Sequence, residues 1–129
     1  MKLKTLKKIA LKYRMELIIL YGSIAKGMQG RQSDIDIGVY LFKNPSEKLE
    51  MAILEDMVNL FKTDALDLAI LNYASPLLNY KVVTEGRLLY EKKKGDFLRF
   101  KLKAIKDYWN TKKFRTAREE FLDKVAAGR

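Results

Sequence analysis

The stretch LIILYGSIAKGMQGRQSDIDIGVYL, residues 17–41, decides how this chain is interpreted. An apolar run ends in Gly22-Ser23, ten residues intervene, and Asp34-Ile35-Asp36 opens a second apolar run. Two short apolar runs joined by a glycine-containing polar segment predict two buried strands that follow each other along the chain. If those strands pair, the glycine-serine turn and the two aspartates meet at one rim of a sheet.

The spacing of the two aspartates suits a metal site. Because side chains alternate along a strand, Asp34 and Asp36 point to the same side. Taken alone such a pair is more often two exposed acids at a strand end, but paired carboxylates also hold Mg²⁺ together with substrate phosphates. Asp67 opens a later apolar run and is the expected third carboxylate, as a metal ligand or as the general base, with Asp64 as its competitor. Three carboxylates and two metal ions would hold a triphosphate for attack by a hydroxyl.

Gly22-Ser23 suits phosphate binding for a separate reason. Glycine lets the backbone approach a phosphate closely, and serine adds a hydroxyl beside the free N–H groups that begin a helix. An ordinary strand-to-helix turn capped by serine would explain the pair alone. Lys26, in the same segment, is a further candidate for the phosphates. The conjunction of this turn with the two aspartates is what indicates a nucleotide site.

The remaining periodicities predict one small mixed sheet flanked by helices, in the α/β or α+β class. Apolar residues at helical spacing among lysines predict a first helix near residues 3–13. Strands are expected at residues 17–21, 35–42, 66–71 and 87–91.

Two helix starts can be read from proline and its neighbours. Asn44 is expected to cap the helix after the second strand, with Pro45 at its first position. Ser75-Pro76 opens another helix, which Gly86 closes.

The C-terminal tail is lysine-rich and aromatic. A helical stripe of Leu98, Leu102, Ile105 and Trp109 predicts the inward face of one bent helix or of two helices. We therefore expect one compact domain at residues 1–92, and a helical extension at residues 93–129 that packs on it or binds a partner.

The amino-acid composition limits which residue types can act in catalysis and which partners the chain would attract. The 129 residues suffice for one domain, and the absence of cysteine and histidine excludes disulfides, thiolate ligands and imidazole bases. The net charge of +10 divides into +6 for residues 1–14, −3 for residues 15–90 and +7 for residues 91–129. Basic ends would attract nucleic acid or an acidic protein, of which we do not favour nucleic acid. The sequence shows no membrane span or secretory signal, so we expect a cytoplasmic protein.

Gly22-Ser23 followed by Asp34-x-Asp36 resembles the signature of the DNA polymerase β-like nucleotidyltransferase superfamily, and the short chain resembles its minimal nucleotidyltransferase (MNT) branch. The resemblance implies a polymerase β-like fold and AMP transfer from ATP. Mg²⁺ would be bound by Asp34, Asp36 and Asp67, and the triphosphate by Gly22-Ser23. It also implies a HEPN toxin partner, whose tyrosine is adenylylated, so that this chain acts as an antitoxin in a complex with it.

Lys26 departs from this family, in which many relatives have arginine at that place. Lysine keeps the charge but loses the planar fork that binds two oxygens at once. Two other functions remain open at this level. One is nucleotidyl transfer to a small hydroxylated molecule, and the other is a non-catalytic basic module that binds RNA or an acidic protein.

Overall fold

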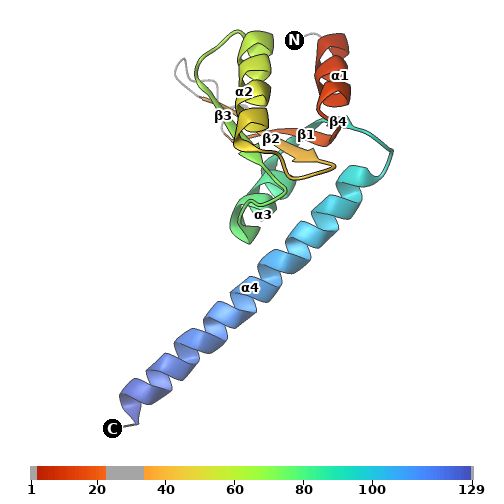
Figure 1. The fold of residues 1–129 in the computed structure, drawn as a ribbon. Helices are drawn as coiled ribbons and strands as arrows, with labels where there is room; N and C mark the ends of the chain where they lie inside the picture. Colours follow the sequence, from red (N-terminus) through yellow and green to blue (C-terminus); the bar gives the residue numbers. More distant parts are fainter. Residues whose placement is uncertain (1–2, 23–33, 129) are drawn as a thin grey trace.

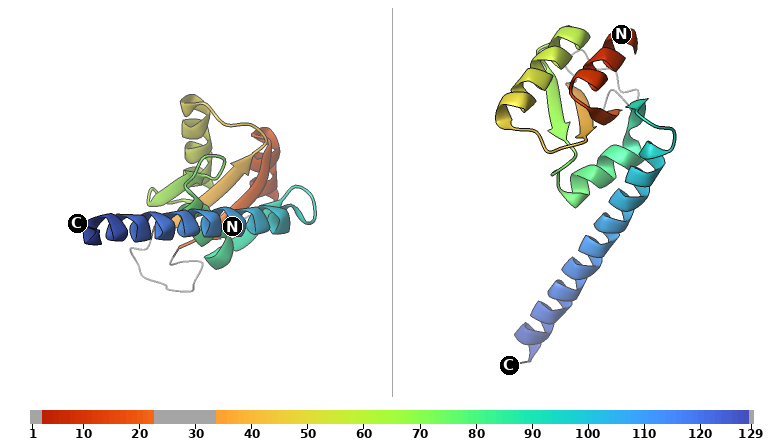
Figure 2. Two further views of the ribbon diagram at one scale, coloured as in Figure 1. Left: turned by 90° about the horizontal axis from the view of Figure 1, so that it is seen from below. Right: turned by 45° about the vertical axis from the view of Figure 1, so that its right-hand side comes forward.

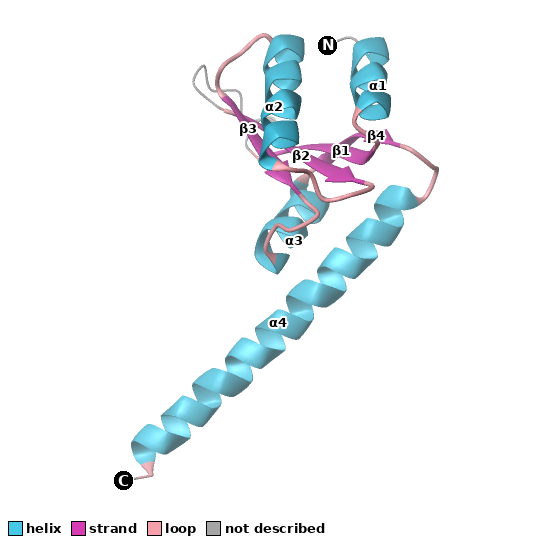
Figure 3. Cartoon of the chain, viewed as in Figure 1, coloured by secondary structure: helices cyan, strands magenta, loops and turns pink. Residues whose placement is uncertain are grey.

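A computed structural model describes residues 3–22 and 34–128 of the chain and shows a four-stranded sheet flanked by helices (Figures 1 and 3). The elements in chain order are α1 (Leu3–Lys12), β1 (Met15–Tyr21), β2 (Ile35–Leu41), α2 (Glu47–Phe61), β3 (Leu66–Ile70), α3 (Pro76–Glu85), β4 (Arg87–Glu91) and α4 (Asp96–Ala127). All four predicted strands are present, so the expected class of fold is confirmed.

The sheet has the strand order β3-β2-β1-β4 and is mixed. β1 pairs antiparallel with β2 and with β4, whereas β2 and β3 are parallel. A parallel pair needs a crossover connection, and α2 provides it. Because β1 and β2 are antiparallel, the end of β1 and the start of β2 lie at the same rim of the sheet.

Helices cover both faces of the sheet (Figures 1 and 2). On the face under α1 and α2, Ile18 and Ile37 pack in one buried cluster with Ile53 and Met57. On the face under α3, Ile19 packs in a second cluster with other buried residues, among them Leu71 and Val82. Strand alternation explains why successive residues of β1 enter different clusters.

The structure corrects one helix start and confirms another. α2 begins at Glu47, and its cap is Ser46, whose Oγ accepts a hydrogen bond of 3.2 Å from the N–H of Leu49. The expectation that Asn44 caps this helix was therefore wrong, because the serine two residues later reaches the free N–H group instead. α3 begins at Ser75-Pro76 as predicted, with Ser75 as its cap and Pro76 at the first position.

α4 is one continuous helix, and it packs through a different face from the predicted one. Leu98, Leu102 and Trp109 of the predicted stripe are exposed. The residues that pack instead recur at helical spacing on a neighbouring face, and only Ala104 among them is fully buried: they are Phe97, Phe100, Ala104 and Tyr108. Aromatic partners explain this choice, since Phe100 lies 4.9 Å from Tyr40 and Tyr108 stacks 4.1 Å from Tyr80 of α3, ring centre to ring centre.

Beyond Thr111, α4 projects from the rest of the molecule (Figures 1 and 2). Every residue from Lys112 to Gly128 is exposed. We call residues 112–127 the free half of α4. Among the helices in the described part of the chain, none is long and apolar enough to cross a membrane.

Candidate active site

Gly22 and Asp36 are in direct contact at the rim of the sheet. Gly22 follows β1 with φ of +80°, a conformation that favours glycine. A methyl group added at Gly22 would overlap Oδ2 of Asp36 and lie 3.0 Å from its Cγ. The carboxylate of Asp36 therefore occupies the space that any other residue at position 22 would need.

Strand register brings Asp67 beside Asp36. Tyr21 at the end of β1 pairs with Asp36, and Asp36 pairs with Asp67 of β3. Residues that pair in neighbouring strands point to the same face, so the two carboxylates share the face that α3 covers. Asp34 immediately precedes β2 and is exposed. The predicted meeting of turn and acids at one rim is thus present for Gly22, Asp36 and Asp67.

The rim has a marked electrostatic character. Partial burial is the main cause that raises the pKa of Asp36 above its usual range, and the charges of Asp67 and Asp34 raise it further. Burial, and then the charges of Asp36 and Asp67, also raise the pKa of Tyr21. Carboxylates held this close repel each other when ionised, and a bound cation relieves that repulsion.

Among the described residues, Lys81 of α3 is the cation whose charge lowers the pKa of Asp36. It opposes the effects of burial and of the neighbouring acids. No sequence pattern indicated this residue, because Lys81 belongs to no motif and lies 45 residues from Asp36 in the chain. A helix periodicity would only have placed it on the exposed side of α3. Its proximity to the carboxylates comes from how α3 packs on the sheet.

Several predicted residues are not tested by this geometry. Ser23 and Lys26 lie outside the described residues. Asp64 is exposed in the turn before β3, and its charge does not act on the pKa of Asp36, whereas that of Asp67 does. Within residues 3–22 and 34–128, no three acidic side chains are close enough to form a ready-made metal site.

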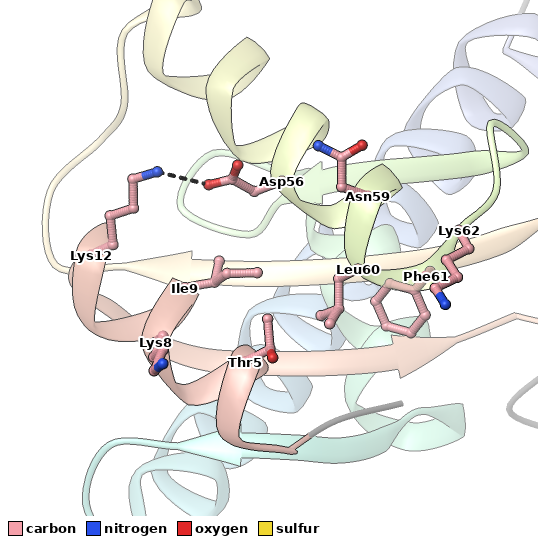
Figure 4. Close-up of a pocket in the computed structure, with 9 residues that line it drawn as sticks. All are labelled: Thr5, Lys8, Ile9, Lys12, Asp56, Asn59, Leu60, Phe61 and Lys62. Atoms are coloured by element: carbon pink, nitrogen blue, oxygen red, sulfur yellow. Dashed lines mark hydrogen bonds and ion pairs between the residues drawn. The ribbon is translucent and has the colours of Figure 1, made fainter.

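A large cavity lies away from this rim. It measures about 700 Å³ and opens between α1 and α2, with Lys12 bonded to Asp56 at 3.1 Å across it and Phe61 on one wall (Figure 4). Asp36 points to the opposite face of the sheet. A smaller hollow of about 470 Å³ between α2 and β3 reaches Asp67 and also contacts Glu47, Glu50 and Met51.

Comparison with protein families adds to this geometry. Residues 4–95 match the family model described as polymerase beta, nucleotidyltransferase. The chain is 32% identical to the protein adenylyltransferase MntA of Shewanella oneidensis over 114 aligned residues. The aligned segment covers 88% of this chain and 78% of the relative.

Solved structures agree in fold over the whole length. A crystal structure of a toxin–antitoxin with AMP-PNP contains a chain with a TM-score of 0.77 and 26% identity, covering 98% of this chain and 99% of that one. A structure of the tri-AMPylated HEPN toxin of Shewanella oneidensis with its MNT antitoxin matches with a TM-score of 0.69 and 24% identity, over 96% and 95% of the two chains. At that identity the second likeness is one of fold alone.

Proposed function

Because this chain belongs to the polymerase beta nucleotidyltransferase family, we propose that it transfers AMP from ATP to a tyrosine hydroxyl of a HEPN toxin and so acts as an antitoxin. The observation that carries the proposal is the contact of Gly22 with Asp36, beside Asp67, at the rim where three strands meet. The likeness to a protein adenylyltransferase over 88% of the chain supports a protein as acceptor. The AMP-PNP in the related toxin–antitoxin structure supports ATP as the nucleotide.

The chemistry of the acidic residues at the rim fits a divalent cation, although the described side chains do not form a ready-made site. Asp34, Asp36 and Asp67 supply the oxygen ligands that Mg²⁺ prefers, and their mutual repulsion favours a bound cation. When bound, Mg²⁺ neutralises charge on the phosphates of ATP. We therefore assign these three aspartates as the metal-binding residues, and the resemblance to the family implies that they hold two ions.

The protein groups then have separate tasks. Gly22 lets the backbone approach the triphosphate, and Ser23 and Lys26 would contact it. The tyrosine oxygen attacks the α-phosphorus of ATP, the bond from that phosphorus to the bridging oxygen breaks, and pyrophosphate leaves. Asp67 accepts the proton of the tyrosine hydroxyl, since a carboxylate beside the acceptor can act as a general base.

Mass spectrometry of the intact toxin tests this proposal. After incubation with this protein, ATP and Mg²⁺, the toxin should gain the mass of AMP on a tyrosine. The variant Asp34→Ala/Asp36→Ala should lose about 1000-fold in rate, because several kcal/mol of charge stabilisation disappear.

Asp67→Ala and Asp64→Ala form a matched pair in the same assay. The first should lose most of the transfer, and the second should stay within about threefold of the wild type, because Asp67 and not Asp64 acts on the pKa of Asp36. A toxin that binds both the wild-type protein and the double variant but gains no AMP from either would overturn the proposed reaction and favour a binding module.

A further inference from the structure

We propose that the toxin docks on an apolar strip along the free half of α4, and that this strip is the tether that holds the acceptor near the rim of the sheet. The strip consists of Phe114, Ala117, Phe121 and Val125. This inference rests on the proposed function, since it assumes a toxin partner. The strip contacts the partner and takes no part in the chemical step at the rim.

The strip is apolar, continuous and uncovered. Its members recur at intervals of three and four residues, which places them on one side of a helix. Phe114 is 76% exposed, Phe121 64% and Val125 56%. An isolated helix of this length is marginal in water, because most helix stability comes from packing an apolar face. A bound partner would supply the missing burial.

The strip does not continue the face that packs on α3. Continuing from Tyr108 at helical spacing, that face would next include Thr111 and Arg115. Thr111 is indeed partly buried, whereas Arg115 is exposed. Phe114 follows Tyr108 by six residues and so lies on another side of the helix. The apolar surface of the free half therefore serves a contact distinct from the intramolecular one.

The charged residues along the free half indicate which kind of partner surface would fit the strip. Arg118 lies between Phe114 and Phe121 on one border of the strip. The other border carries Lys113, Glu120 and Lys124, so both borders have a net positive charge. The acids Glu119 and Asp123 are each two residues from Phe121, which puts them on the far side of the helix. The matching surface is thus an apolar groove bordered by acidic side chains.

A toxin is a better occupant than a second copy of this chain. Two copies would bring the same basic borders against each other, which costs binding energy. In the related toxin–antitoxin structure, the matching chain aligns with 98% of this chain, so the match extends into the free half of α4. A protein interface would also bury the exposed aromatic rings of the strip, and aromatic residues are enriched in such interfaces.

Binding of purified toxin to the full-length chain, measured by isothermal titration calorimetry, tests the proposal. The variant Phe114→Ser/Phe121→Ser should weaken toxin binding about 100-fold, as expected for two aromatic anchors. The matched control Leu98→Ser/Leu102→Ser removes two equally apolar residues, 58% and 60% exposed, from another face of the same helix. It should change the affinity by less than about threefold.

ATP binding separates this inference from the proposed reaction. Both variants should bind ATP as the wild type does, and the strip variant should modify the toxin with a raised KM and an unchanged kcat. Wild-type protein that binds toxin but transfers no AMP would overturn the reaction and leave the docking strip in place. Equal affinities of the two variants, or loss of RNA binding in the strip variant with toxin binding intact, would overturn the docking strip.

Discussion

The rim of the sheet and the free half of α4 differ in how much of their geometry the rest of the chain determines. At the rim, Gly22 follows β1 while Asp36 and Asp67 belong to β2 and β3, and each is held by register or by direct contact with another. In the free half of α4, the backbone of a single helix positions every side chain, and all of its residues are exposed. The protein thus prepares its candidate reacting groups in advance and leaves the contact with its partner to be completed on binding.

Substitution of Gly22 should have the largest effect, because it strains the rim twice. Gly22→Ala places a side chain at a φ of +80° and pushes Asp36 from its position. We expect AMP transfer to fall by at least about 100-fold, as displacement of a reacting group by 1 Å can cost that much. Unfolding in urea should show a loss of about 1–3 kcal/mol.

Gly95→Ala is the matched control for that experiment. Gly95 has a φ of +97°, but an added methyl group would meet only the mobile end of Arg99, at 3.1 Å. This variant should lose about 1 kcal/mol of stability and keep its transfer rate. Equal losses of transfer in the two variants would mean that backbone strain, and not the displaced carboxylate, limits the reaction.

The next largest effect should be a difference in stability between two variants of α4, each with one glutamate introduced into a different half of the helix. Ala104 is 4% exposed against α3, so Ala104→Glu should cost about 2–3 kcal/mol through burial of a charge. Ala117 belongs to the free half, and Ala117→Glu should stay within about 0.5 kcal/mol of the wild type. Urea unfolding of the isolated protein measures both. A large loss from Ala117→Glu would show that the free half packs on its own chain.

The smallest expected effect is a gain in stability that depends on pH. Burial and neighbouring acids raise the pKa of Asp36 in the folded protein above its ordinary value of 3.8, so the ionised form costs the folded state free energy. Without divalent cations, Asp36→Asn should be more stable than the wild type at pH 8, by less than about 1 kcal/mol because solvent screens the partly exposed carboxylate. The gain should shrink as the pH falls through the folded pKa and vanish near pH 3.

Asp123→Asn in the free half provides the comparison, since Asp123 is exposed and should change stability little at either pH. A gain from Asp36→Asn that stays constant between pH 8 and pH 3 would contradict the assigned cause. It would mean that the amide packs better at the rim regardless of charge.

Much of the fold follows from local pattern. Each strand was visible as a short apolar run bounded by polar residues, and Ser75-Pro76 marked the start of α3. The meeting of Gly22 with Asp36 was also predictable, because antiparallel neighbours necessarily bring the end of one strand to the start of the next. The approach of Lys81 to Asp36 was not predictable, because it depends on how α3 packs on the sheet.

α4 shows where local pattern fails. Two neighbouring helical stripes, one through Leu98 and one through Phe97, are equally apolar by spacing alone. The choice between them was made by Tyr40 and Tyr80, which lie far away in the sequence and receive Phe100 and Tyr108. Burial is decided by such distant partners, so the sequence predicted a helix correctly and its inward face wrongly.

The contact between Gly22 and Asp36 also constrains how this chain can evolve. A side chain at position 22 meets the carboxylate of Asp36, so the two positions are energetically coupled and their substitutions do not add. A lineage that loses Asp36 is released from half of the constraint on Gly22, and only the backbone conformation still favours glycine there. The two residues should therefore tend to disappear together, and a homologue that keeps both still carries the geometry on which the reaction depends.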